Sequence, residues 1–268
     1  MDDTSATLNT YSRDASVFCV RPKLVVFPKD VDDVKNLVAY VGAARKDGAE
    51  ISLTARSAGT DMSGGPLTES IVVEFTKYFG NFVEMGADYA VVEPGMYYRD
   101  FEKKTLEHGL LLPSYPASRE LCTVGGMVAN NSGGEKTLSY GKTEQYIEEL
   151  HMVLSDGNEY VFRALSPAEL SEKKSAGTFE GEIYRKMSAL IQENRKLIAG
   201  AKPQVTKNSS GYFLWNVSPS TGSSPEGSRL STAGQAASQT FDLTRLIVGS
   251  QGTLGFVTKI KFKLVHPK

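Results

Sequence analysis

The sequence predicts an α+β fold of two α/β lobes, a smaller one that contains parallel strands and a larger one built on antiparallel pairs. The first observation is that short apolar runs alternate with one amphipathic stretch between residues 23 and 93. This order is typical of a strand–helix–strand unit with a parallel pair. The second is a pair of strand-like runs around a turn at residues 149–163, which predicts an antiparallel hairpin. The third is the alternation of apolar and polar residues over 256–264, which predicts a half-buried strand.

The composition is that of an ordinary globular protein. The chain has 268 residues, a net charge of -1, 40% hydrophobic residues and 23% charged residues, which excludes a disordered acidic chain, a collagen-like repeat and a coiled coil. No apolar run approaches the roughly 20 residues of a membrane span, and the near-neutral charge gives no support for a nucleic-acid partner. The opening residues show no signal peptide. Two cysteines, Cys19 and Cys122, suit a reducing compartment, so we expect a cytoplasmic location.

The smaller lobe is expected to span about residues 20–95. Its helix is predicted because Val34, Val38 and Val41 fall at helical spacing after Asp30, a candidate N-cap. After an irregular lead-in of about 20 residues, the pattern predicts a helix at 31–46 and strands at 23–27, 50–54, 71–75 and 89–93.

The larger lobe is expected to span about residues 96–268. Its clearest helix is predicted at 180–199, where Ile183, Met187 and Ile191 share one apolar face. Residues 218–239 are rich in Ser, Gly, Ala and Thr, which predicts a mobile inserted surface loop. The other predicted elements are a helix at 97–108, the hairpin at 149–163 and the terminal strand at 256–264.

A glycine-rich segment, residues 55–65, directly follows a predicted strand. Small residues let a backbone approach a ligand closely, and successive N–H groups can hold a diphosphate. The hydroxyls of Ser57, Thr60 and Ser63 would add donors. The alternative is a tight surface turn. The spacing matches neither a P-loop nor a dinucleotide-binding Rossmann turn.

Two further segments are rich in small residues. The run over residues 116–134 costs much conformational entropy unless something orders it. It would suit a flat aromatic ligand laid against the backbone, and the alternative is a flexible lid. The third segment, residues 249–255, precedes the terminal strand. The alternative to a ligand-binding role for this segment is a hairpin or bulge turn.

Together, the three segments resemble in order and spacing the FAD-binding (PCMH-type) domain of the vanillyl-alcohol oxidase and p-cresol methylhydroxylase superfamily. The lead-in at residues 11–16 and the stretch 210–214 also match, so the resemblance covers nearly the whole chain as one such domain, residues 1–268. The loop forms are most similar to those of D-lactate, glycolate and D-2-hydroxyacid dehydrogenases. Ser57 replaces the usual glycine and Gln251 the usual glutamate.

The resemblance implies that FAD lies extended between the two lobes. The loop of residues 55–64 would hold the diphosphate, Pro116, Ser118 and residues 123–134 would line the flavin and ribityl chain, and later residues would close around the cofactor. The implied cofactor-binding residues are Ala55, Arg56, Ser57, Ala58, Gly59, Thr60, Asp61, Ser63, Gly64, Pro116, Ser118, Thr123, Gly125, Gly126, Asn130, Asn131, Ser132, Gly133, Gly134, Gly141, Ile147, Gln251, Gly252 and Val257.

The resemblance also bears on how FAD is attached. Family members that link FAD through histidine carry that residue in the first loop, where this chain has Thr60. Cys122 lies near the place where some related oxidases have a cysteinyl link, but no activating base neighbours it in sequence, so we expect a small buried thiol. Non-covalent FAD is therefore expected.

The implied activity is that of an FAD-dependent oxidoreductase domain, which takes a hydride from a D-lactate-like or glycolate-like 2-hydroxy acid onto the flavin N5. Family enzymes continue into a cap domain that supplies the substrate pocket and metal ligands, and we expect that domain to be absent here. His108, His151 and His266 are too far apart in sequence to suggest a metal site, so no catalytic residue or metal ligand is assigned. The alternatives are a flavin module or subunit that passes electrons to a partner or iron–sulfur domain, and an aldonolactone or alcohol oxidase.

Overall fold

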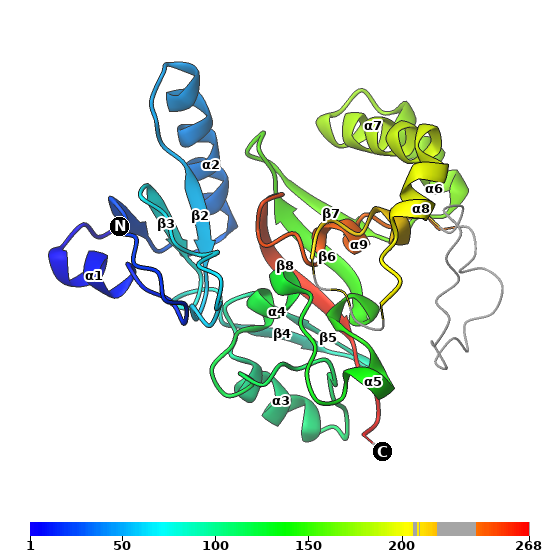
Figure 1. Ribbon diagram of the computed structural model, residues 1–268, viewed down its shortest axis with the longest axis horizontal. Helices are drawn as coiled ribbons and strands as arrows, with labels where there is room; N and C mark the ends of the chain where they lie inside the picture. Colours follow the sequence, from blue (N-terminus) through cyan, green and yellow to red (C-terminus); the bar gives the residue numbers. More distant parts are fainter. Residues whose placement is uncertain (206–207, 209, 219–239, 268) are drawn as a thin grey trace.

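Two β-sheets stand side by side in the computed structural model, which describes residues 1–205, 208, 210–218 and 240–267 (Figure 1). The first sheet has three parallel strands in the order β1-β3-β2, and the second has five antiparallel strands in the order β4-β5-β8-β6-β7. The α+β class with one parallel and one antiparallel sheet is confirmed. The strands are β1 (Leu24–Val26), β2 (Leu53–Arg56), β3 (Ile71–Glu74), β4 (Phe82–Met85), β5 (Tyr89–Val92), β6 (Ile147–Val153), β7 (Glu159–Arg163) and β8 (Phe256–Lys263).

The predicted helix at 31–46 is confirmed as α2 (Val31–Lys46). The Asp30 carboxylate accepts a hydrogen bond from the Asp33 N–H and so caps its first turn. The lead-in was expected to be irregular, and this expectation was wrong for α1 (Ser5–Thr10), which Thr4 caps. Leu8 of α1 packs in the small apolar cluster beside β1, and this burial orders a helix too short to be stable alone.

The strand at 89–93 was expected in the smaller lobe, and that assignment was wrong. It forms β5, which pairs with β8 so that Ala90 lies opposite Phe262. Ala90 and Val92 are fully buried in the core of the antiparallel sheet. The boundary between the sheets therefore falls between β3 and β4, before the expected residue 95. A four-residue apolar run fits either sheet equally well, so the sequence alone did not separate them.

In the antiparallel sheet, β8 is flanked by β5 and β6, and the hairpin of β6 and β7 is confirmed. The predicted helix at 180–199 divides at Asn194, whose side-chain Nδ2 donates to the Leu190 carbonyl at 2.9 Å and so competes with the helix ladder. The helices around this sheet are α3 (Tyr98–Leu106), α4 (Val124–Asn130), α5 (Thr137–Tyr140), α6 (Pro167–Ser175), α7 (Phe179–Glu193), α8 (Arg195–Ala201) and α9 (Thr244–Ile247). Two 3-10 turns, Thr143–Tyr146 and Leu214–Asn216, complete the described elements.

An apolar cluster joins the two sheets. Val34 and Val38 of α2 pack with Phe75, which follows β3, and with Val153 and Phe256 of the antiparallel sheet. The Phe75 and Phe256 rings stack with their centroids 5.9 Å apart. The end of β2 therefore lies where the parallel sheet meets the antiparallel one (Figure 1).

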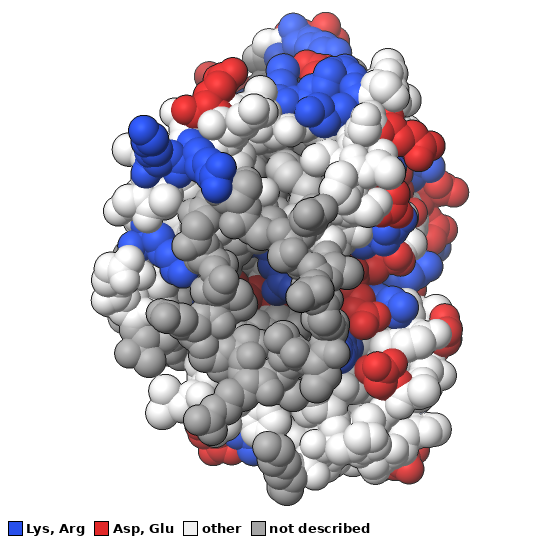
Figure 2. Space-filling model, turned by 90° about the vertical axis from the view of Figure 1, so that its right-hand side faces the viewer, with Lys and Arg blue, Asp and Glu red and all other residues white. Residues whose placement is uncertain are grey.

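The outer helices present a surface of mixed charge. Basic and acidic side chains lie side by side along the right-hand edge of the view in Figure 2. The ion pairs of the outer helices include Lys173 of α6 with Glu180 of α7, and Lys186 with Glu182 within α7. The insertion predicted at 218–239 lies, apart from Ser218, outside the described residues. No helix within the described part is long and apolar enough to cross a membrane.

Candidate functional site

The loop after β2 is folded by its own side chains and glycines. Gly59 and Gly64 take left-handed backbone conformations, with φ of +68° and +84°, which glycine adopts without steric cost. The Asp61 carboxylate accepts hydrogen bonds from the N–H groups of Ser63 at 3.3 Å and Gly65 at 2.6 Å. Asp61, expected among the cofactor ligands, thus closes the far half of the loop on itself.

The near half of this loop keeps its backbone donors. Within the described ranges, no protein group accepts a hydrogen bond from the backbone N–H groups of residues 58–62. Buried backbone donors are normally paired in folded proteins, and in this partly exposed loop water or a ligand can accept from them. A run of five such groups in one small-residue loop is an arrangement suited to an anion.

Arg56, at the end of β2, adds a positive charge beneath the loop. Its guanidinium donates to the carbonyl oxygens of Tyr11 at 3.3 Å and Arg13 at 2.6 Å, and the residue is only 8% exposed. Burial lowers the pKa of Arg56, an effect that Tyr11, Asp14 and Glu74 partly offset. In the part of the chain that the structure describes, no carboxylate lies within 4.0 Å of this guanidinium. Because Asp14 and Glu74 offset only part of the cost of burying this charge and neither pairs directly with the guanidinium, Arg56 favours an anionic ligand.

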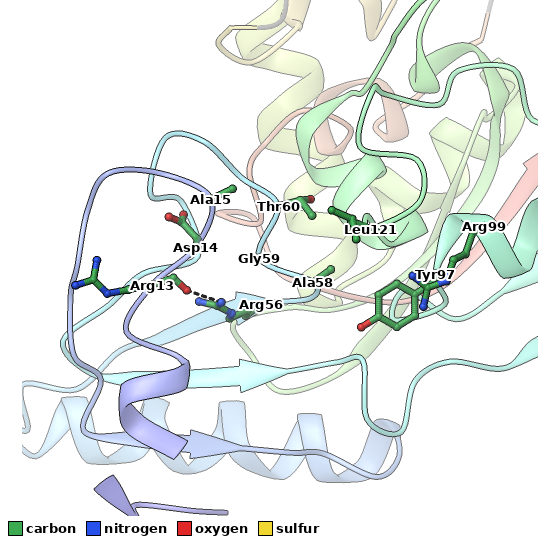
Figure 3. Close-up of a pocket in the computed structure, with 10 residues that line it drawn as sticks. All are labelled: Arg13, Asp14, Ala15, Arg56, Ala58, Gly59, Thr60, Tyr97, Arg99 and Leu121. Carbon is green, nitrogen blue, oxygen red and sulfur yellow. Dashed lines mark hydrogen bonds between the residues drawn. The ribbon is translucent and has the colours of Figure 1, made fainter. Parts of the chain in front are cut away.

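A cavity of about 490 Å³ lies against this loop, within the size range of small-molecule sites (Figure 3). The Ala15 N–H donates to the Gly59 carbonyl at 3.0 Å, which fixes the lead-in beside the loop. The walls of the cavity come from residues on both sides of the boundary between the two sheets. The lining residues are Arg13, Asp14, Ala15, Arg56, Ala58, Gly59, Thr60, Tyr97, Arg99 and Leu121.

Six of these lining residues were absent from the predicted set. The lead-in residues carried one usable signal, the match of residues 11–16 to the opening of the family, which was not extended to the site. Tyr97, Arg99 and Leu121 carried none, because a single Tyr or Arg at the start of a helix has no distinctive spacing.

The structure brings the second and third small-residue segments together at the end of β2. The N–H groups of Gly249 and Gln251 each donate at 2.9 Å, to the carbonyls of Val128 and Ala129. A Cβ added to Gly252 would lie 3.8 Å from the Ala55 Cβ. Parts of all three predicted segments therefore converge, although up to 197 residues separate them in sequence, from Ala55 to Gly252.

Several glycines of the second segment serve packing. The Gly125 N–H donates to the Pro94 carbonyl at 2.8 Å, and a Cβ there would lie 2.5 Å from the Pro94 Cβ. A Cβ at Gly134 would lie 2.3 Å from the Tyr115 carbonyl oxygen, beside Pro116. The Thr123 hydroxyl caps α4 by accepting from the N–H of Gly126 at 3.2 Å, so much of this segment is helix.

Polar residues at the end of α4 are also engaged within the protein. Asn131, buried with φ of +48°, donates through Nδ2 to the Glu144 carboxylate at 2.8 Å and accepts from the Glu144 N–H. The Asn130 amide donates to the Ser132 hydroxyl at 3.2 Å and accepts from Gln251 at 3.4 Å. These bonds hold the second segment against its neighbours.

Other predicted residues take different positions. Ser118 lies in the turn before α4, where its carbonyl accepts from the Cys122 N–H at 2.9 Å. Gly133 packs against Thr137 and Lys142. Gly141 ends α5, which lies well apart from the loop after β2 (Figure 1).

Ile147 and Val257 are not brought together. In the β6–β8 ladder, Ile147 pairs with Phe262 and Val257 with Met152, so the two lie toward opposite ends of the ladder.

The two cysteines are expected to differ sharply in reactivity. Both thiols are free, with Cys19 exposed and Cys122 buried, and burial raises the pKa of Cys122 to about 11. The thiolate is the reactive form, so Cys122 stays protonated and unreactive until the pH approaches 11.

Native protein treated with iodoacetamide at pH 8 should carry one adduct, at Cys19, by mass spectrometry. Both thiols should react in urea, and alkylation of Cys122 in the folded protein would contradict the prediction.

Comparison with known proteins identifies relatives along the whole chain. A family model described as "FAD binding domain" matches residues 22–162, more than half of the sequence. D-2-hydroxyglutarate dehydrogenase of Pseudomonas putida is 27% identical over 97% of this chain and 24% of its own length. Glycolate oxidase subunit GlcD of Bacillus subtilis is 26% identical over 98% of this chain and 42% of its own length. D-lactate dehydrogenase of Archaeoglobus fulgidus is 32% identical over 50% of this chain and 29% of its own length.

A solved structure shares the fold. An alkyldihydroxyacetonephosphate synthase aligns with a TM-score of 0.61 and 16% identity over 99% of this chain and 37% of that chain. The chain thus spans less than half the length of these relatives. The matches confirm the resemblance drawn from the three small-residue segments.

Proposed function

The chain belongs to the FAD binding domain family, and from that membership we propose that it is the flavin-binding part of an oxidoreductase that oxidises a 2-hydroxy acid. The relatives named above are enzymes of 2-hydroxyglutarate, glycolate and D-lactate. Each of these compounds carries a hydroxyl group on the carbon next to a carboxylate. This shared chemistry supports the substrate class.

The fit of FAD rests on one observation. Among the described residues, the buried Arg56 guanidinium has no carboxylate within 4.0 Å, and it lies beside N–H groups of residues 58–62 that donate to no protein group. The FAD diphosphate is an anion rich in acceptor oxygens, which is what this set of donors requires. These donors lie against a cavity whose lining residues come from both sides of the boundary between the two sheets. The residues present therefore fit the cofactor.

In this proposal, the residues of the chain bind and orient the cofactor. Bound FAD supplies a two-electron acceptor for the oxidation of the substrate. Arg56 and the loop N–H groups neutralise and fix the diphosphate, and the Asn131–Glu144 hydrogen bonds keep the second segment in place beside it. We propose that the substrate pocket and the group that takes up the hydroxyl proton lie in the part of the relatives that this chain does not match. The two free thiols favour a reducing compartment such as the cytoplasm.

The proposal predicts that purified chain takes up FAD non-covalently. After incubation with FAD and desalting, the protein should keep the visible absorption bands of flavin. Acid precipitation should release all of the flavin to the supernatant, because Thr60 stands in the loop and the Cys122 thiol is buried. Protein without flavin bands would contradict FAD binding, and flavin in the acid pellet would contradict the non-covalent attachment.

The substrate class has its own test. The FAD-loaded protein is combined with the part of the Pseudomonas putida relative that this chain does not match and is mixed without oxygen with D-2-hydroxyglutarate, D-lactate or glycolate, and the loss of the oxidised flavin band is followed. Glutarate, which lacks the hydroxyl group, is the matched control. Bleaching by a 2-hydroxy acid and not by glutarate is expected, and equal absorbance with all of them would contradict the proposed substrate class.

A further inference from the structure

We propose that Tyr97 and Leu121 form the wall on which the isoalloxazine ring of FAD stacks, an inference that rests on the proposed function. Both residues line the cavity opposite the loop of residues 58–60. Neither belongs to the glycine-rich loop, and together they give the cavity a second face with a different chemistry.

This second face combines an aromatic ring and an aliphatic side chain with the Arg99 guanidinium. Figure 3 shows the Tyr97 ring extending from the start of α3 toward Ala58, with Arg99 farther from the loop. The Arg99 guanidinium lies 4.5 Å from the Tyr97 ring centroid, and it donates to the Glu120 carbonyl at 2.6 Å, which fixes its place. Leu121 is 61% exposed. An aromatic ring and an aliphatic side chain opposite anion-binding donors suit a ligand that joins a planar ring to a phosphate group.

The backbone holds this face against the second segment. Tyr97 forms an isolated antiparallel bridge with Thr123. The N–H of Leu121 donates to the Ser118 carbonyl at 2.8 Å, which closes the turn that carries Leu121. The wall is therefore built on ordered backbone that continues into α4, and its place relative to the loop is set by the fold.

FAD has two ring systems, one on each side of its diphosphate. Near Ala55 the loop meets Gly252, whose neighbours Gln251 and Thr253 are exposed. At the cavity, Leu121 and the side chain of Arg99 are 61% and 43% exposed. The ring that exchanges electrons with a substrate must be reachable from outside, and the exposed wall of the cavity meets this requirement. Competition by ADP distinguishes the isoalloxazine ring from the adenine ring at this wall.

The test uses Tyr97→Leu and Tyr97→Phe, with Tyr40→Leu on the exposed face of α2 as the matched control. A phenol in contact with flavin quenches its fluorescence by donating an electron to the excited ring. Tyr97→Leu should raise the fluorescence of bound flavin several-fold and weaken FAD binding about tenfold, the typical loss for a ring stacked on an aromatic side chain. Tyr97→Phe should restore affinity but not quenching, and Tyr40→Leu should change neither quantity.

A second variant distinguishes the loss of a contact with FAD from misfolding of the protein. Leu121→Ser alters an exposed side chain, so the chain should fold, and FAD affinity should still fall. The inference is overturned if wild-type protein binds FAD but Tyr97→Leu leaves both affinity and fluorescence unchanged. It is also overturned if Tyr97→Leu weakens competition by ADP without changing flavin fluorescence, because the wall would then hold adenine. Failure of wild-type protein to bind FAD would instead contradict the proposed function.

Discussion

Gly59→Val is expected to reduce FAD affinity by about a hundredfold, a loss of about 2.7 kcal/mol, while the protein stays folded. Gly59 has φ of +68°, where a side chain strains the backbone by about 1–2 kcal/mol. A Cβ at this position would also lie 2.5 Å from the Arg56 Nη2 atom. The hydrogen bond from that atom to the Arg13 carbonyl holds it in place. Either the guanidinium or the loop must move, and both movements displace donors from the diphosphate. Fluorescence titration gives the affinity, and denaturant unfolding gives the stability.

Gly48→Val is the matched control for this change. Gly48 follows α2 with φ of +90°, and a Cβ added there would have no neighbouring atom within 4 Å, so the substitution brings the same kind of backbone strain without a clash. It should lower the free energy of unfolding by about 1–2 kcal/mol, as in Gly59→Val, and leave FAD affinity unchanged. Equal losses of FAD affinity in the two variants would show that general destabilisation, and not the loop, explains the effect.

The elements with strong local patterns were predictable from the sequence. The helix α2 has an apolar stripe and an N-cap, and β8 has a regular alternation, so burial and local preference agree. The sheet to which β5 belongs was not predictable, because its partner β8 lies more than 160 residues later in the chain. Helix α4 was also missed, since its two glycines indicate loop, whereas the Thr123 cap and contact with Pro94 stabilise a helix.

The candidate site divides in the same way. The loop of residues 55–64 was predictable, because small residues after a strand have a physical reason to be there. The cavity wall of Tyr97 and Leu121 was not, because it depends on how α3 and the turn before α4 meet the loop in space. At Gly125 and Gly134, a pattern attributed to a ligand also serves close packing of the protein backbone.

Arg56→Met is expected to weaken FAD binding by at least about thirtyfold, because truncating one partner of a buried charge pair costs about 2–5 kcal/mol. The free protein should change much less. Met loses the hydrogen bonds to the carbonyls of Tyr11 and Arg13, at a cost of about 1–3 kcal/mol, but it also removes a buried cation without a carboxylate partner. The two effects on unfolding oppose each other, whereas both the lost charge and the lost donors weaken binding.

Arg45→Met, at an exposed position in the last turn of α2, removes the same charge from the protein without touching the loop. It should bind FAD as the wild type does, which separates a local effect at Arg56 from a change in net charge. Arg56→Lys keeps the charge but loses the planar fork, so its affinity should fall between those of wild type and Arg56→Met. If Arg56→Met binds FAD with unchanged affinity, the buried guanidinium does not face the diphosphate. The anion-binding role would then rest on the backbone N–H groups of residues 58–62 alone.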